Sequence, residues 1–295
     1  MAKLVGCLLV LMGYVSYSLH SPKWKKPKTE LSLVKTTFAD LAIPQETEME
    51  LRQTVQLFKD VCEGKSKHYR KGVLLYGPSG TGKTRIARAI ANEANVNLVS
   101  INASEFIEFS LGEGSKRVRE LFEEARKQAP CVLFIDELDA LGRRGMASLS
   151  SGLTHERNLT INQLLVEIDG FEESDHVLII AATNRVKMVE SALIRSGRFD
   201  QKIKLELPGA YQRYQILNKK IRIQRDVSLT DESILDIAEK TAGYSGADIE
   251  ALINEAVYAS IHSGRQTLAL HDLETAFDKL SAGLVADDIQ DVQVK

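Results

Sequence analysis

Cysteine is scarce in this chain of 295 residues, which contains only Cys7, Cys62 and Cys131. Three cysteines form no disulfide framework, so the sequence indicates a protein of a reducing compartment. Cys131 begins an apolar run, and we expect it to be a small buried side chain. An excess of positive charge is also missing, since 38 Lys and Arg residues are matched by 40 Asp and Glu residues. This balance argues against a protein that coats nucleic acid, which requires a basic surface, and we expect no nucleic-acid partner.

Pairs of histidines with the spacing of a helical zinc site are missing as well. No two of the six histidines lie four residues apart, so the H-E-x-x-H pattern of a zinc-binding helix does not occur. His155 and Glu156 begin this pattern, but Arg157, Asn158 and Leu159 follow them. The sequence therefore predicts no zinc site of this kind.

Long uncharged runs are limited to the N-terminus, where Leu4 to Leu19 contains no charged residue. As a helix this run would span roughly 24 Å, which is shorter than the roughly 30 Å hydrocarbon core of a bilayer. Residues 1–20 are therefore either a minimal membrane anchor or a signal peptide. A basic linker, residues 21–35, follows and begins with a cluster of four lysines, Lys23, Lys25, Lys26 and Lys28. By the positive-inside rule we expect an anchored protein whose body faces the cytoplasm, with a cleaved signal and an organellar or lumenal location as the alternative.

Short apolar runs alternate with helical periodicities between residues 36 and 207. The apolar runs are GVLLYG (72–77), NLVSI (97–101), CVLFID (131–136), HVLIIAA (176–182) and KIKLEL (202–207). The helical patterns between them include residues 83–94, 116–128 and 159–168. Strands that alternate with helices predict an α/β fold, with a parallel sheet sandwiched by helices.

Residues 208–284 show helical periodicity only. We expect helices over residues 211–221, 231–240 and 271–280, and a further helix from Ser245 to Gly264 that begins with a Ser-x-x-Asp capping pattern. A small all-helical domain therefore follows the α/β domain. Residues 285–295 form an acidic tail, which we expect to be disordered.

The sequence GPSGTGKT at residues 77–84 matches the pattern G-x-x-x-x-G-K-[ST] of a phosphate-binding loop. It follows a predicted strand and precedes a predicted helix, which is the context that this loop requires. Glycines let the backbone close around a phosphate so that amide N–H groups face the anion. We expect Lys83 to reach the β- and γ-phosphates and the Thr84 hydroxyl to bind Mg²⁺. The loop residues expected to bind the nucleotide are Pro78, Ser79, Gly80, Thr81, Gly82, Lys83 and Thr84.

A second motif, CVLFIDE at residues 131–137, ends an apolar strand with two acids. A carboxylate in this place lies at the carboxyl edge of the sheet, beside the loop that follows the first strand. Asp136 suits Mg²⁺, and Glu137 suits polarisation of an attacking water. The sequence thus predicts a nucleotide-hydrolysing site at this edge.

Six segments together resemble the AAA+ ATPases, and more narrowly the ATPase module of the FtsH-type membrane-anchored proteases. They are GPSGTGKT (77–84), CVLFIDELDALG (131–142), NQLLVEIDGF (162–171), AATNR (181–185), RSGRFD (195–200) and GYSGADIEALINEA (243–256). The resemblance runs from about Phe38 to Leu280. It implies a P-loop NTPase domain over residues 36–207, a helical lid domain over residues 208–284, and ATP with Mg²⁺ as cofactors.

The resemblance also implies roles for particular residues. Asn184 matches the sensor that positions the attacking water, and Arg195 and Arg198 match the arginine fingers that reach into a neighbouring subunit. A lone subunit should then hydrolyse ATP poorly, so we expect a closed ring, a homo-hexamer or a mixed ring. Asp169-Gly170-Phe171 matches the element that carries nucleotide state between subunits, and Gly246-Ala247 matches the lid turn near the adenine and ribose.

Two positions near the expected base-binding site depart from the family pattern. The family often has Gly where Ile43 stands and His where Lys220 stands. These differences leave the base preference and the affinity open, whereas the phosphate end matches the pattern fully.

A third departure lies in EFIEFSLGEGSKRV at residues 105–118, which aligns with the family's central-pore loop. The family tripeptide there is aromatic, hydrophobic and glycine, and it grips an extended polypeptide. In this sequence it reads Ser110, Leu111 and Gly112. A serine offers far less apolar, flat surface than an aromatic ring, so each stroke should grip less.

These features predict an ATP-hydrolysing ring that remodels or unfolds protein substrates, at a membrane and without a peptidase of its own. A separate protease is a candidate partner. The first alternative is an ATPase that controls assembly or disassembly of a complex without processive threading, which Ser110 favours. The second is a weakly hydrolysing, nucleotide-dependent scaffold, against which the intact phosphate end argues.

Overall fold

The computed structural model describes residues 27–30, 36–66, 70–107, 112–142, 151–172, 175–224 and 229–292. None of the helices within these ranges combines the length and the apolar composition that crossing a bilayer requires. The predicted anchor or signal, residues 1–20, lies outside the described residues, as do Ser110 and Leu111 of the predicted pore loop.

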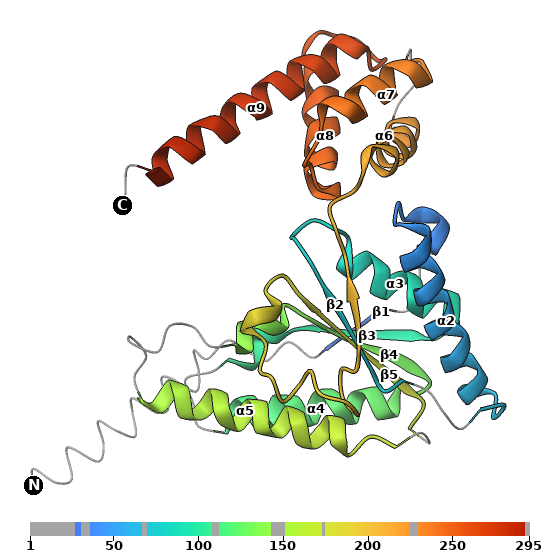
Figure 1. Ribbon diagram of the computed structural model, residues 1–295, viewed down its shortest axis with the longest axis vertical. Coiled ribbons are helices and arrows are strands. Elements are labelled where there is room, and N and C mark those ends of the chain that lie inside the picture. Colours follow the sequence, from blue (N-terminus) through green and yellow to red (C-terminus); the bar gives the residue numbers. More distant parts are fainter. Residues whose placement is uncertain are drawn as a thin grey trace, which may run out of the picture.

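The described large domain is built on a six-stranded sheet in the order β1-β3-β4-β5-β2-β6 (Figure 1). Every pair is parallel except β1 with β3, which is antiparallel. The strands are β1 (Lys28–Glu30), β2 (Gly72–Tyr76), β3 (Asn97–Asn102), β4 (Cys131–Asp136), β5 (Val177–Thr183) and β6 (Gln201–Lys204). The five apolar runs thus form the five parallel strands, which confirms the predicted α/β fold. Strand β1 was not expected, since it lies within the predicted basic linker.

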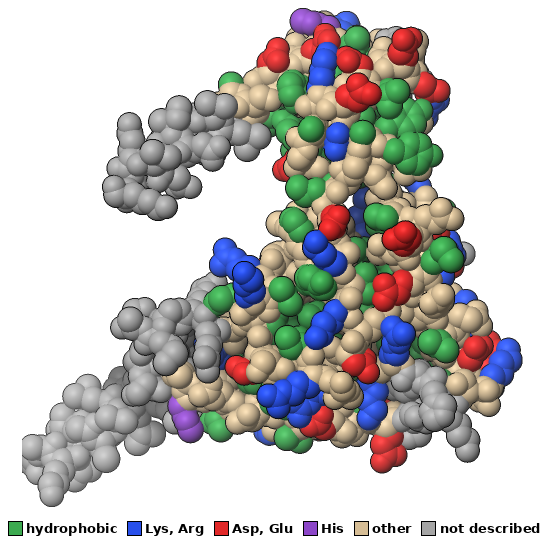
Figure 2. Space-filling model, viewed as in Figure 1, with side chains coloured by type: hydrophobic (Ala, Val, Ile, Leu, Met, Phe, Trp, Pro, Cys, Tyr) green, Lys and Arg blue, Asp and Glu red, His purple; other side chains and the backbone are tan. Residues whose placement is uncertain are grey.

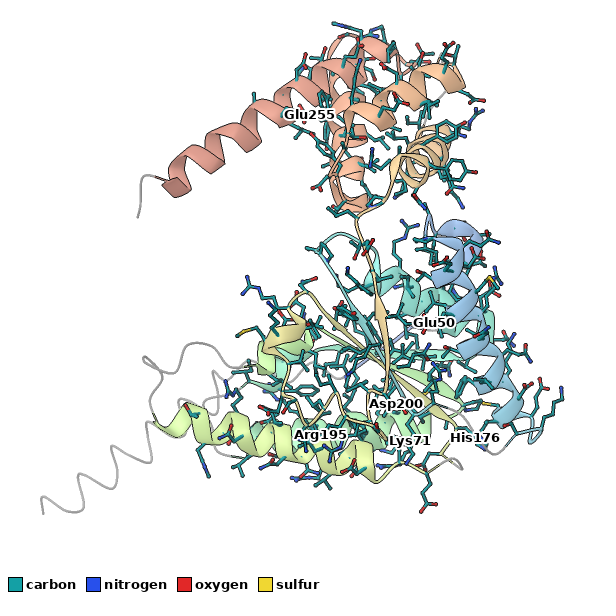
Figure 3. All side chains as sticks on the ribbon, in the orientation of Figure 1. Glu50, Lys71, His176, Arg195, Asp200 and Glu255 are labelled. Carbon is teal, nitrogen blue, oxygen red and sulfur yellow. The ribbon has the colours of Figure 1, made fainter. Side chains whose placement is uncertain are left out.

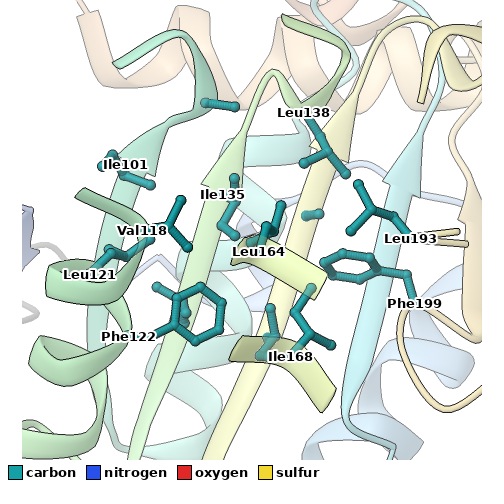
Figure 4. Close-up of a cluster of buried hydrophobic side chains, with 14 of the residues drawn as sticks. Ile101, Val118, Leu121, Phe122, Ile135, Leu138, Leu164, Ile168, Leu193 and Phe199 are labelled. Carbon is teal, nitrogen blue, oxygen red and sulfur yellow. The ribbon is translucent and has the colours of Figure 1, made fainter. Parts of the chain in front are cut away.

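Helices cover both faces of this sheet (Figure 1). One face packs against α4 (Glu113–Lys127) and α5 (Ser151–Asp169), and the other against α2 (Gln45–Cys62) and α3 (Lys83–Ala94). On α4, four apolar residues with helical spacing, Val118, Leu121, Phe122 and Ala125, are fully buried. Figure 4 shows several of them packed against side chains from β3, β4 and α5. Central strand β5 is buried along its whole length, which explains its continuous apolar run.

Cys131 lies inside this sheet, at the start of β4. Its side chain is fully buried, and its thiol donates a hydrogen bond to the Ala125 carbonyl at 3.2 Å. Burial raises the pKa of the Cys131 thiol to about 12. The expectation of a small buried side chain is confirmed.

A helical domain follows β6 and has its own core. It contains α6 (Ala210–Gln224), α7 (Asp231–Lys240), α8 (Gly246–His262) and α9 (Leu270–Val292). Ser245 caps α8 through the predicted capping box, in which its hydroxyl accepts from the Asp248 N–H at 3.3 Å. Disorder was expected in the acidic tail, but α9 continues as a helix to Val292. Residues 281–292 contain no proline that would end the helix.

Candidate active site

The glycine-rich loop connects β2 to α3 at the carboxyl edge of the sheet. It approaches other parts of the chain so closely that a side chain has no room at two positions. A Cβ on Gly77 would lie 2.0 Å from the Leu205 carbonyl oxygen, and a Cβ on Gly80 would lie 2.3 Å from the Ser245 hydroxyl. Gly80 also has a φ of +74°. The loop is therefore fixed by β6 on one side and by the first turn of α8 on the other.

Lys83 lies inside this loop and is only 7% exposed. Its ammonium donates to the carbonyl oxygens of Gly77 at 2.9 Å and Pro78 at 2.6 Å. Burial lowers the pKa of Lys83, and the carboxylates of Asp136 and Asp139 oppose this shift. A positive charge is thus held where amide groups and a helix N-terminus also favour an anion.

Thr84 and Asp136 meet at the same edge, with the Thr84 hydroxyl donating to the Asp136 carboxylate at 2.8 Å. Among the described residues, no group of three or more His, Cys, Asp or Glu side chains is arranged to hold a metal ion. Mg²⁺ does not need such a group, since it usually keeps several waters and takes one or two carboxylates plus phosphate oxygens. The hydroxyl and carboxylate oxygens of this pair therefore fit Mg²⁺.

Glu137 follows Asp136 in a left-handed backbone conformation, with a φ of 52°. Its carboxylate accepts a hydrogen bond from the Asn102 side chain at 2.9 Å. Asn102 ends β3 and is the direct neighbour of Asp136 in the parallel ladder. Sequence reasoning missed Asn102 as a site residue, and its place directly after the strand predicted at residues 97–101 was the one local signal.

Asn184 follows β5, the next strand across the sheet, and lines the same cleft as Lys83, Asp136 and Glu137. Its backbone N–H lies 3.4 Å from the Asp139 carboxylate, which also accepts from the Thr183 hydroxyl at 2.8 Å. Asp139 thus ties the end of β5 to the segment after β4. The strand order brings the predicted phosphate-end residues together at one edge of the sheet.

The lid domain closes the other wall of this cleft, which has a volume of about 1490 Å³. Gly246 and Ala247 line it, and a Cβ on Gly246 would lie 3.1 Å from the Gly80 carbonyl oxygen. The first turn of α8 therefore packs directly on the glycine-rich loop. In the face shown in Figure 2, basic and acidic side chains are interspersed over both domains.

The far end of the cleft is lined by Ile43 from the large domain and by Lys219, Lys220 and Glu250 from the lid. The Lys220 ammonium lies 2.6 Å from a Glu250 carboxylate oxygen. Lys219 pairs with Asp40 of the large domain and also donates to the Ala39 carbonyl at 3.2 Å. The hydrogen bond from Lys219 lowers the pKa of Asp40 to about 2. Both positions that depart from the family pattern, Ile43 and Lys220, thus lie at this end.

The two predicted arginine fingers do not line this cleft. Arg195 is exposed, and Figure 3 shows it on the α5 side of the large domain, away from the lid. Arg198 donates twice to the Asp169 carboxylate, at 2.7 and 2.6 Å, and once to the Ala192 carbonyl at 2.6 Å. This contact lowers the pKa of Asp169 and raises that of Arg198. Contacts within its own chain therefore hold the Arg198 side chain, whereas the Arg195 side chain is exposed.

The segment Asp169-Gly170-Phe171 is fixed by several contacts besides Arg198. Phe171 is buried, its ring lies 5.4 Å from that of Phe122, and the Arg126 guanidinium lies 4.6 Å above it. The Lys71 ammonium donates to the Phe171 carbonyl at 2.6 Å. The end of α5 is thus anchored to both α4 and the start of β2.

Gly112 is the part of the predicted pore tripeptide that the structure describes, and it caps α4 with a φ of 83°. Glu156 of α5, only 3% exposed, accepts from the N–H groups of Gly112 at 2.7 Å and Gly114 at 3.2 Å. A buried carboxylate at a helix N-terminus is well stabilised by these donors. It fixes the first turn of α4 against α5.

A parallel sheet that carries a glycine-rich anion loop, a buried lysine and two carboxylates at one edge defines a P-loop nucleotide-binding protein. Comparison with family models supports a P-loop nucleotide-binding protein and indicates which family of this class the chain belongs to. The model of the ATPase family associated with various cellular activities (AAA) matches residues 73–207, and that of the AAA+ lid domain matches residues 231–275. The chain therefore belongs to the AAA+ ATPases, a family that binds ATP, typically with Mg²⁺.

Several curated relatives are similar to the ATPase region in particular. The ATP-dependent zinc metalloprotease FtsH of Aquifex aeolicus is 42% identical over 252 residues, covering 85% of this chain and 39% of the relative. FtsH 2 of Salinibacter ruber is 44% identical over 254 residues, with 85% and 37% covered. FtsH of Cyanidium caldarium is 42% identical over 263 residues, with 88% and 42% covered. The chain thus spans about two fifths of the length of these relatives.

Proposed function

We propose that this chain hydrolyses ATP within a ring of subunits and uses the energy to remodel or unfold protein substrates at a membrane. The phosphate end of the cleft carries this proposal. There, one edge of the sheet carries Lys83, Thr84, Asp136 and Glu137, and Asn184 lies directly after the neighbouring strand β5. The relatives are named as ATP-dependent zinc metalloproteases, which supports work on protein substrates by their ATPase part.

In this proposal Lys83 binds the β- and γ-phosphates, and Thr84 with Asp136 holds Mg²⁺. When bound, Mg²⁺ neutralises charge on these phosphate oxygens. Glu137 orients the attacking water, Asn102 holds the Glu137 carboxylate in place, and Asn184 orients the water from the other side. Arg195 and Arg198 lie outside their own subunit's cleft, so we assign them to the cleft of a neighbour, which gives a reason for a ring.

The replacement Glu137→Gln tests the proposal, because it removes the carboxylate and keeps the shape. We expect ATP binding to persist, hydrolysis to fall by about 10²- to 10⁴-fold, and rings to accumulate in ATP. Turnover is measured by phosphate release and ring size by light scattering. Wild-type turnover in the Glu137→Gln variant would contradict the role of Glu137.

A second candidate function is control of the assembly of a complex without threading, which Ser110 in place of an aromatic residue favours. The replacement Ser110→Phe separates the two candidates. If threading is limited by a weak grip, Ser110→Phe should raise ATP-dependent unfolding of a tagged model substrate without raising basal turnover. Full-rate unfolding by both the wild type and Ser110→Ala would show that the serine does not weaken the grip.

The membrane location and the protease partner are further parts of the proposal. The uncharged run at residues 4–19 supports a membrane anchor, and flotation of the full chain with liposomes tests it. The absence of H-E-x-x-H from the sequence supports remodelling without a zinc peptidase in this chain. Degradation of a labelled unfolded protein by the purified chain, blocked by a zinc chelator, would contradict this part.

A further inference from the structure

The end of the cleft away from the glycine-rich loop contains a pair of charged side chains that the phosphate chemistry does not use. Lys220 of α6 and Glu250 of α8 both line the cleft, and their charged atoms lie 2.6 Å apart. The Lys220 side chain is 26% exposed and that of Glu250 is 47% exposed, so both remain open to the cleft. Gly246 packs on the glycine-rich loop, and Glu250 lies one turn further along the same face of α8, so we place the base of a nucleotide bound at the loop toward this pair.

The pair presents two complementary hydrogen-bonding groups. An ammonium has three donors and no acceptor, and a carboxylate has only acceptors, with room for several donors on its two oxygens. Each group therefore has capacity beyond the one contact that joins them. Charged groups also make stronger hydrogen bonds than neutral ones, so a base placed beside this pair is read by its donor and acceptor pattern.

Adenine and guanine differ in this pattern along the edge formed by N7 and the substituent at position 6. Adenine presents the N7 acceptor beside the N6 amino donor, whereas guanine presents two acceptors, N7 and O6. An ammonium beside a carboxylate matches acceptor and donor, as in adenine. The same carboxylate faces the lone pairs of O6 in guanine and repels them.

We propose that Lys220 and Glu250 are specificity-determining residues that read the base: Lys220 donates to N7, and Glu250 accepts from the N6 amino group. Glu250 is then the group that prefers adenine over guanine, because N7 is common to both bases. The inference rests on the proposed nucleotide-binding function of the same cleft. It goes beyond that function in assigning the base selection to two side chains of the lid.

The neighbouring lysine has a different task, which makes the assignment specific. Lys219 pairs with Asp40 across the boundary between lid and large domain and also donates to the Ala39 carbonyl, so its ammonium is engaged by the large domain. Loss of Lys219 should weaken the closed cleft for every nucleotide alike. Loss of Glu250 should change the ratio between nucleotides.

The experiment measures competition of unlabelled ATP, ITP, GTP and 7-deaza-ATP against one ribose-labelled fluorescent ADP, using the full chain with Mg²⁺. We expect wild type to prefer ATP over both GTP and ITP, and Glu250→Ala to reduce each ratio by about tenfold. ITP isolates position 6, since it has an oxygen there and lacks the 2-amino group of guanine. Lys220→Ala should lower the affinities for ATP and GTP together. It should also abolish the difference in affinity between ATP and 7-deaza-ATP, which we expect to be about tenfold in wild type.

Two control variants separate base reading from general damage. Glu255→Ala removes another α8 carboxylate, which pairs with Lys279 and does not line the cleft, and should leave all ratios and affinities unchanged. Lys219→Ala should lower the affinities while keeping the ratios. Two results would overturn the inference: affinity ratios in Glu250→Ala equal to those of wild type, or a wild type that does not prefer ATP over GTP and ITP. If ATP still binds and is hydrolysed, the proposed function stands in either case. A wild type that binds neither ATP nor GTP would overturn the proposed function as well.

Discussion

The two ends of the cleft are built in different ways. At the phosphate end, main-chain groups of the loop and side chains from adjacent strands are fixed by close packing, such as the approach of Gly77 to Leu205. At the base end, side-chain ion pairs join three separate elements, the 3-10 helix η1 (Phe38–Asp40), α6 and α8. The phosphate end is thus preorganised within the sheet, whereas the base end depends on where the lid lies.

This difference predicts how substitutions act at each end. A change at the phosphate end should affect binding or catalysis strongly and without regard to the base. A change at the base end should have a smaller effect, since its ion pairs are partly exposed and exposed pairs contribute little. The following predictions test this comparison in order of decreasing effect.

The largest effect concerns whether the phosphate end is complete within one chain. If a neighbouring subunit supplies an arginine, Arg195→Ala should lower the rate of ATP hydrolysis by about 10³-fold or more, with ATP affinity nearly unchanged. Since no side-chain hydrogen bond or ion pair among the described residues holds Arg195, and alanine keeps its backbone carbonyl, the free energy of unfolding should not change. Turnover and thermal melting measure the two effects, and a lone subunit with full turnover would show that the site is complete without a neighbour.

Arg198 provides the matched comparison, because it donates twice to Asp169 in its own chain. Arg198→Ala should lower turnover as well, and it should also reduce the free energy of unfolding by up to about 1 kcal/mol, since the pair is partly exposed. Asp169→Asn should reproduce the loss of stability. Equal melting temperatures for Arg195→Ala and Arg198→Ala would contradict this distinction.

The next effect tests whether the phosphate end ignores the base. Lys83→Ala removes the ammonium inside the loop and should weaken ATP and GTP equally, by about a hundredfold, which is the loss of one strong hydrogen bond to a charged group. Lys127→Ala, at an exposed position near the end of α4, is the control and should bind both nucleotides as wild type does. A change in the ratio of ATP to GTP affinity in Lys83→Ala would contradict the separation of the two ends.

A smaller effect tests a place where the lid packs on the phosphate end. Gly80 and Gly82 both have positive φ, at +74° and +86°, but only a Cβ on Gly80 would meet the lid, at Ser245 and Ala247. Alanine at either position costs about 1 to 2 kcal/mol of backbone strain. In nucleotide-free protein Gly80→Ala should cost about 1 to 3 kcal/mol more than Gly82→Ala, through overpacking. Equal unfolding free energies would show that the lid moves aside freely.

How far the sequence predicts this cleft follows from the same comparison. The phosphate end arises from two short motifs, each read together with the strand before it, so Lys83, Thr84, Asp136 and Glu137 were predicted. Asn102 was missed because it acts through a neighbouring strand, and strand neighbours follow from the sheet order rather than from the sequence. The sequence predicts that these side chains share the carboxyl edge of the sheet. It does not predict which residues of neighbouring strands contact one another there.

The base end was less accessible to sequence reasoning. Lys219 and Asp40 are 179 positions apart, and their contact depends on the lid position, so no local pattern indicates it. Ile43 and Lys220 were expected near the base only through the family resemblance. Their partners, including Glu250, appear once α6 and α8 are placed side by side.

The smallest effect concerns the Lys219–Asp40 pair, which links the lid to the large domain. Lys219→Ala and Asp40→Ala should each weaken ATP and GTP alike, by about threefold, because an exposed pair is worth up to about 1 kcal/mol. The double replacement should be no weaker than either single one, since both remove the same contact. Raising the salt concentration to about 1 M should abolish the difference from wild type, because the Debye length falls to about 3 Å.

The pH dependence of this pair has a definite sign. The hydrogen bond from Lys219, together with those from Thr37, lowers the pKa of Asp40 from 3.8 to about 2. The contribution of the carboxylate to lid closure is therefore complete above about pH 4 and is lost as the pH falls toward 2. Nucleotide affinity in wild type and in Lys219→Ala should therefore keep the same ratio between pH 6 and pH 8, where about all of the carboxylate is ionised. A ratio that changes within this range would mean that another titrating group, and not the Asp40 carboxylate, sets the attachment of the lid.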